Sequence, residues 1–227
     1  MNLLFVAVPY AAFACFVVGV AARFRRGATI SSRSSQILES RWLVWGTVPF
    51  HIGITVLFLG HLIPLLIPDA WRVFVSHRAA LVLVESAGLA AAVLCLTGLV
   101  VLFIRRIASR PVRAGSAPAD LVVLGVLILQ VGAGIGVATM HRWGAMWSVA
   151  TIVPYLRSLV MLHPDPALVA GIPPLMLTHL AGAWIVLALL PFTRLVHMLT
   201  FPLGYLVRAP QKVVWVTRPK RGQVCDL

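Results

Sequence analysis

The chain has 227 residues, of which 60% are hydrophobic and 11% are charged, and its formal charge is +13. A soluble domain carries about 25% charged residues, so this composition argues against a water-soluble enzyme. It also argues against a nucleic-acid-binding protein, because the basic residues stand between apolar runs and membrane topology explains them better.

Five apolar runs are long enough for a transmembrane helix, which needs about 17–25 residues. They cover residues 3–22, 44–67, 80–104, 121–140 and 172–198. The first run lacks a preceding basic region and is followed by arginines, which favours a retained helix over a cleaved signal. The sequence therefore predicts an all-α integral membrane protein with a five-helix domain over residues 1–199. We expect the basic segment 200–227, interrupted by three prolines, to be a cytoplasmic tail that docks on a partner.

The basic residues predict the orientation of the five helices. Fifteen Lys and Arg residues flank one side of the predicted membrane domain and four flank the other. Positive residues accumulate on the cytoplasmic side of membrane proteins. The sequence therefore predicts an outer amino terminus and a cytoplasmic carboxyl terminus.

Four histidines lie inside two of these runs: His51 and His61 in the second, His179 and His197 in the fifth. Ionisable groups are costly in a bilayer and are usually functional there, and neutral imidazole is the commonest metal ligand. The two helices run in opposite directions, so depth pairs His61 with His179 near the outer face. It pairs His51 with His197 near the inner face.

The spacing of the histidines requires the fifth helix to tilt or to bend. Ten residues separate His51 from His61, a rise of about 15 Å, whereas the eighteen residues between His179 and His197 rise about 27 Å in a straight helix. Pro191 lies between the latter two and can kink the helix. We therefore expect tilt or a bend near Pro191.

Two pairs of histidines in a membrane predict two metal centres, and two b-type haems are the natural candidates. Two imidazoles close both axial positions of a haem iron, so such a group relays electrons and does not bind oxygen. The sequence contains no Cys-x-x-Cys-His motif, which predicts haems held without thioether bonds. In the alternative, structural interpretation, each histidine only forms a hydrogen bond to a neighbouring helix. This interpretation explains a single histidine better than four histidines in matched pairs.

Several stretches resemble the gamma subunit of respiratory nitrate reductase, in order along nearly the whole chain. In the second helix the resemblance rests on Phe50, His51, Ile52 and Gly53, followed by Gly60 and His61. In the fifth it rests on residues 191–197, which read Pro-Phe-Thr-Arg-Leu-Val-His. Residues 34–36, 93–96, 105–106 and 111–114 match as well. The four histidines are the specific part of the resemblance.

The resemblance implies a cytochrome b in the bacterial cell membrane that takes electrons from the quinone pool. His61 and His179 would hold an outer, distal haem, and His51 and His197 an inner, proximal haem. Quinol would be oxidised near the outer face. Electrons would then pass to a beta subunit with iron–sulfur clusters and an alpha subunit with a molybdenum cofactor, which reduces nitrate to nitrite.

Further candidate residues follow from this arrangement. The quinol site is expected at Gly60, His61 and the start of the third helix, where Arg78 is the candidate for a basic quinone contact and His77 the alternative. Glu85 could accept a quinol proton or could pair with Arg78. At the inner rim, Arg113 and Arg194 are candidates for haem propionates, because a guanidinium binds a carboxylate in a bidentate way.

Other functions share some of these features. Another quinol-oxidising cytochrome b anchor, or a cytochrome of the ferric-reductase type, would also carry paired histidines. A transporter with histidine proton relays belongs to a different class. A b-type haem spectrum would separate the cytochromes from the transporter, and a molybdenum subunit that co-purifies would separate the cytochromes from one another.

Overall fold

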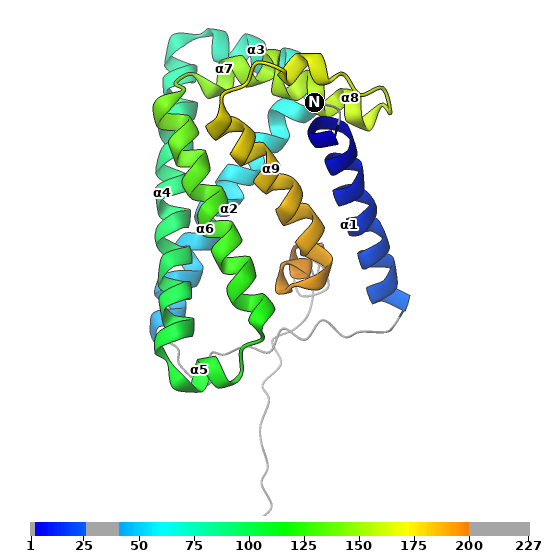
Figure 1. The fold of residues 1–227 in the computed structure, drawn as a ribbon. Coiled ribbons are helices and arrows are strands. Elements are labelled where there is room, and N and C mark those ends of the chain that lie inside the picture. Colours follow the sequence, from blue (N-terminus) through cyan, green and yellow to red (C-terminus); the bar gives the residue numbers. More distant parts are fainter. Residues whose placement is uncertain (1–2, 26–40, 200–227) are drawn as a thin grey trace, which may run out of the picture.

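The computed structural model describes residues 3–25 and 41–199, and every regular element in these ranges is a helix. Five long helices form an up-and-down bundle (Figure 1). They are α1 (Val8–Arg25, preceded by the π-helical turn Leu3–Ala7), α2 (Arg41–Leu66), α4 (Arg78–Ala108), α6 (Pro118–Met140) and α9 (Pro174–Leu189). Each is long and apolar enough to cross a membrane, α9 together with the turn that follows it to Phe192. The predicted five-helix membrane protein is confirmed.

Local sequence explains where several helices begin. Pro68, Pro118 and Pro174 each occupy the first position of a helix, where no intrahelical N–H bond is lost. The long helices remain apolar around most of their circumference, and Leu129 is 74% exposed. Helices of this kind are stable in a lipid environment, because the exposure of so much apolar surface to water is unfavourable.

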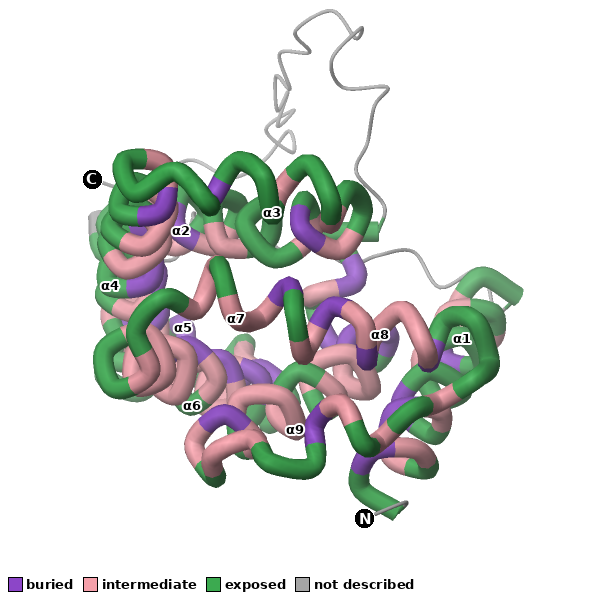
Figure 2. The backbone as a smooth tube through the Cα atoms, turned by 90° about the horizontal axis from the view of Figure 1, so that it is seen from above, coloured by how far each residue is buried: buried purple, intermediate pink, exposed green. Residues whose placement is uncertain are grey.

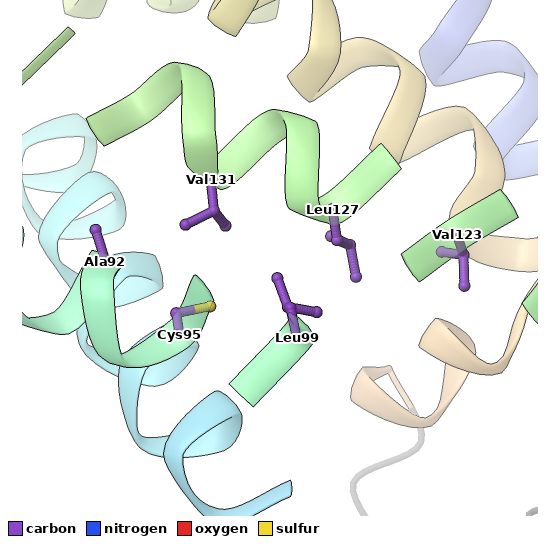
Figure 3. Close-up of a cluster of buried hydrophobic side chains, with 6 residues drawn as sticks. All are labelled: Ala92, Cys95, Leu99, Val123, Leu127 and Val131. Atoms are coloured by element: carbon purple, nitrogen blue, oxygen red, sulfur yellow. The ribbon is translucent and has the colours of Figure 1, made fainter. Parts of the chain in front are cut away.

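Helices α2 and α4 pack tightly against each other. A Cβ atom on Gly98 would lie 2.5 Å from the backbone nitrogen of Phe50, and one on Gly53 would lie 2.5 Å from the carbonyl oxygen of Ala91. Glycine at these positions lets the two backbones approach closely. The adjoining core lies between α4 and α6 (Figure 3). It is formed by Ala92, Cys95, Leu99, Val123, Leu127 and Val131.

Three short helices lie across one end of the bundle, which we call the capped end (Figures 1 and 2). They are α3 (Pro68–Ser76), α7 (Gly144–Ala150) and α8 (Ile152–Val160). Fully buried Tyr155 ties α8 to the amino-terminal turn, because its hydroxyl donates to the Phe5 carbonyl at 2.7 Å. Burial raises the pKa of Tyr155 to about 12. The end opposite the cap carries α5 (Arg110–Ala114).

The fifth predicted span is wrong at its carboxyl end. The run 172–198 is not one helix: α9 ends at Leu189, and 3-10 turns follow at Leu190–Phe192 and Arg194–Met198. Thr193 between them is extended, with φ −120° and ψ 179°. Pro191 has no N–H to continue the helix, and its carbonyl accepts a 2.8 Å bond from Nη1 of Arg23. The bend required by the histidine spacing is therefore present.

Two parts of the sequence-based interpretation fall outside the described residues. They are the tail 200–227, which was expected to dock on a partner, and the basic residues of the segment 26–40 that entered the charge count.

Candidate metal centres in the helix bundle

The structure brings the four histidines together in two pairs. Near the capped end, the ring centroids of His61 on α2 and His179 on α9 lie 6.2 Å apart, with 46° between the ring planes. Toward the opposite end, the centroids of His51 and His197 also lie 6.2 Å apart, with 57° between the planes. These are the same pairs that helix direction predicts.

The break after α9 makes the second pair possible. In a straight helix His197 would lie about 27 Å along the axis from His179, well beyond the roughly 15 Å that separates the two histidines of α2. The extended residue Thr193 redirects the chain, and the following 3-10 turn carries His197 back toward His51. The unequal rises are thereby reconciled.

Every histidine of the two pairs is oriented by a bond from its Nδ1 atom to a backbone carbonyl. The acceptors are Thr47 for His51 (2.8 Å), Leu57 for His61 (2.6 Å), Gln130 for His179 (3.1 Å) and Arg194 for His197 (2.5 Å). A carbonyl oxygen can only accept, so Nδ1 carries the hydrogen in each case. The Nε2 atom of each ring therefore keeps its lone pair for another partner, which is the usual arrangement of a metal-binding histidine.

This donor set fits a haem. Two imidazoles that face one metal ion, with metal–nitrogen bonds of about 2 Å and ring centres about 1 Å farther out, have centroids about 6 Å apart. Both pairs have this spacing. In the described part of the chain, no group of three or more His, Cys, Asp or Glu side chains could hold a metal ion. Each pair thus offers two protein donors, and a porphyrin would supply the remaining four.

An ion cluster that the sequence does not predict lies beside the His51–His197 pair. The buried carboxylate of Asp120, at the start of α6, accepts from Nε of Arg194 at 2.9 Å and lies 2.5 Å from Nη1 of Arg106 at the end of α4. The carbonyl of Arg194 in turn accepts the Nδ1 bond of His197. Pro118 followed two residues later by an acidic residue is a helix-start signal that could have drawn attention to Asp120.

The two arginines expected at the inner rim occupy different surroundings. Arg194 joins the Asp120 cluster next to His197. Arg113 lies exposed on α5, and its Nη1 donates to the Ile107 carbonyl at 3.3 Å. Arg194 is therefore linked to a histidine pair, because its carbonyl accepts the Nδ1 bond of His197. Arg113 is bonded instead to the end of α4.

The candidate quinol residues lie toward the capped end. Oε1 of Glu85 accepts the backbone N–H of Ala145 in α7 at 2.7 Å, a partner different from the expected Arg78. The carbonyl of Ala145 accepts from Nε1 of Trp71 in α3 at 3.2 Å. Glu85 therefore helps to fasten the cap over the bundle. Arg78 opens α4 and is exposed, as is His77 before it.

Gly60, the remaining candidate, stands next to His61 on α2. A Cβ atom at Gly60 would meet nothing within 4 Å. The position is thus open on the side of α2 that a side chain would occupy.

Comparison with known proteins shows one consistent relationship. A model of the nitrate reductase gamma subunit family matches residues 1–216. The nitrate reductase gamma chain of Bacillus subtilis is 31% identical over 211 residues, which cover 88% of this chain and 92% of that protein. The respiratory nitrate reductase 1 gamma chain of Escherichia coli is 33% identical over 215 residues, covering 90% and 93%. The nitrate reductase-like protein NarX of Mycobacterium tuberculosis is 33% identical over 97% of this chain, which spans 35% of that longer protein.

Proposed function

Because this chain belongs to the nitrate reductase gamma subunit family, we propose that it is the di-haem cytochrome b that oxidises quinol for that enzyme. It is a multi-pass membrane subunit of an oxidoreductase. In the proposal, His61 and His179 hold one b-type haem and His51 and His197 hold the other, neither bound covalently. A haem with two axial histidines supplies one-electron transfer.

The observation that carries this proposal is that the four histidines share one hydrogen-bonding pattern and lie in two pairs. All four donate from Nδ1 to a backbone carbonyl, and they face one another in two pairs with equal centroid separations. A proton relay in a transporter does not require two histidines to face each other with both Nε2 lone pairs available. The donor set therefore favours the cytochrome.

We place quinol oxidation at the capped end and propose that this end faces outward. The positive-inside pattern of the sequence supports this orientation. The proposed quinol site comprises Gly60, His61, Arg78 and Glu85. Arg78 would bind a quinol oxygen, and the carboxylate of Glu85 would accept a proton. Protons would leave on the outer side while electrons move inward, so charge would separate across the bilayer.

The opposite end would deliver the electrons to partner subunits. In the proposal these are the cytoplasmic beta subunit with iron–sulfur clusters and the alpha subunit with the molybdenum cofactor, which reduces nitrate. At this end Arg110 begins α5 and is exposed, whereas Arg105 is buried and Arg106 pairs with Asp120. We propose that Arg194 and Arg113 bind haem propionates at this end, Arg194 with the stronger support because it lies three residues from His197.

The test compares two electron donors in membranes that contain the chain together with its alpha and beta subunits. A quinol analogue must pass electrons through this subunit, whereas a dye that reduces the cytoplasmic subunits directly need not. We expect His61→Ala and His179→Ala to abolish nitrite formation with the quinol and to preserve it with the dye.

The matched control is His163→Ala, because His163 is an exposed histidine near the capped end and belongs to neither pair. It should leave both activities unchanged. Quinol-driven nitrite formation that survives in His61→Ala would overturn the proposal.

A further inference from the structure

We propose that Gln130 is the positioning residue of His179, and that it sets the properties of the centre at the capped end independently of the other centre. The inference rests on the proposed function, since it treats His179 as a haem ligand. It concerns a residue on α6, a helix that carries no member of either histidine pair.

His179 is held differently from the other three histidines. The Nδ1 atoms of His51 and His61 bond to carbonyls four residues earlier in their own helix, and that of His197 bonds to one three residues earlier. The Nδ1 of His179 instead crosses to α6 and donates to the backbone carbonyl of Gln130 at 3.1 Å. The orientation of this one ring therefore depends on a second helix.

The contact between Gln130 and His179 is reciprocal. While the Gln130 carbonyl accepts from the imidazole, the Gln130 side-chain amide donates from Nε2 to the His179 carbonyl at 3.0 Å. Two bonds between one pair of residues fix both the distance and the rotation of α9 relative to α6 at this level. The imidazole cannot turn without the loss of at least one of them.

Two glycines create the space for this arrangement. Gly134 is four residues after Gln130, and a Cβ atom there would lie 2.9 Å from Cε1 and 3.4 Å from Nδ1 of His179. On α9, a Cβ atom on Gly182 would overlap Oε1 of Gln130. Glycine on one helix thus admits the imidazole, and glycine on the other admits the amide.

The electronic consequence follows from the Nδ1 bond. A ligating histidine whose second nitrogen donates a hydrogen bond is more basic, and a more basic ligand favours the oxidised iron. A weaker Nδ1 bond should therefore raise the reduction potential of the centre that His179 serves. The hydrogen bonds described for Gln130 go to His179 and not to His51 or His197, so the centre that those two histidines serve should be unaffected.

The experiment is a redox titration of the b-type absorbance in membranes that contain the complete enzyme. Gln130→Met keeps the side-chain length and the backbone carbonyl that accepts from Nδ1 of His179, but it removes the amide bond to the His179 carbonyl. Without that second bond α9 is free to shift relative to α6, which should lengthen and weaken the Nδ1 bond. Gly134→Ala forces the imidazole to move. Gly132→Ala is the matched control: it makes the same change on the same helix, lies about 200° around it, and its Cβ would meet nothing within 4 Å.

We expect Gln130→Met to raise the midpoint potential of one of the two components, the one that disappears in His179→Ala, and to leave the other in place. Gly134→Ala should shift the same component further or remove it, which would halve the haem content per chain. Gly132→Ala should match the wild type. If Gly134→Ala does not accumulate in membranes, the titration of Gln130→Met alone tests the proposal.

The inference is overturned if both components keep their potentials in Gln130→Met, or if Gly132→Ala moves the same component as Gly134→Ala. Either result would leave the proposed function intact, since the wild type would still contain both b-type components. A wild-type membrane without b-type absorbance would instead remove the proposed function and, with it, this inference.

Discussion

Asp120 and Arg194 form an ion pair, with Oδ1 and Nε 2.9 Å apart, although 74 residues separate them in the chain. Asp120 stands in the first turn of α6, and Arg194 lies just after the break that follows α9. The pair fastens the bent segment to the bundle. Because the Arg194 carbonyl also orients His197, the position of one proposed haem ligand depends on this contact.

Asp120→Asn should destabilise the bent segment. The carboxylate is buried and faces both Arg106 and Arg194, and removal of one member from a buried ion pair costs about 3 kcal/mol or more. We expect a lower thermal unfolding temperature in detergent and preferential loss of the centre served by His197. Thermal unfolding followed by haem absorbance measures both effects.

Asp69→Asn provides the control for that change. Asp69 pairs with Arg72 at 4.0 Å on the surface, where both side chains are largely exposed. Exposed pairs contribute little to stability, so this variant should unfold like the wild type. Equal behaviour of the two variants would contradict the role assigned to Asp120.

Gly98→Ala should force α2 and α4 apart. The added methyl group would meet the backbone nitrogen of Phe50 at 2.5 Å, and backbone atoms cannot rotate away as a side chain can. Overpacking of this kind costs about 1–3 kcal/mol. Because α2 carries a histidine of each pair, we expect lower thermal stability and less of both haems per chain.

Gly88→Ala, on the same helix, controls for the change in helix propensity. A Cβ atom at Gly88 would meet nothing within 4 Å. This variant should be as stable as the wild type or slightly more stable. If Gly98→Ala behaved in the same way, the close approach of α2 and α4 would not limit stability.

Glu85 can be tested for two separable roles. Glu85→Gln keeps an oxygen that can accept the Ala145 N–H but removes the carboxylate. If Glu85 accepts a quinol proton, the quinol-driven rate should fall about a hundredfold, with the dye-driven rate and the thermal stability preserved. Glu85→Ala should also lose stability, because the Ala145 N–H is left without its acceptor. A normal quinol-driven rate in Glu85→Gln would leave Glu85 only its structural role.

The sequence predicted the five long helices well, because apolar runs of this length have few other structures available. Helix direction also predicted which histidines meet, since depth in the membrane is set by position along the chain. The unequal rises indicate that the fifth helix must tilt or bend near Pro191, but they do not identify Thr193 as the extended residue that makes the turn.

The remaining features depend on contacts between distant segments. Helices α3, α7 and α8 are too short to produce a spanning run and were not predicted. The sequence indicates Arg78 as a partner of Glu85, but the N–H of Ala145 donates to Glu85 in the folded chain. This contact forms only when α7 folds over the bundle, so no local pattern predicts it. The bonds of Asp120 to Arg194 and of Gln130 to His179 join residues 74 and 49 positions apart, which no local pattern reveals.

In the proposed function, each of the two histidine pairs holds one b-type haem. The most direct measurement is the haem-to-chain ratio, together with the reduced-minus-oxidised spectrum, of the purified enzyme and of His61→Ala and His197→Ala. We predict two b-type haems per chain in the wild type and one in each variant, with a different spectral component lost in each. A wild-type enzyme without a b-type spectrum, or a variant that retains both haems, would contradict the claim.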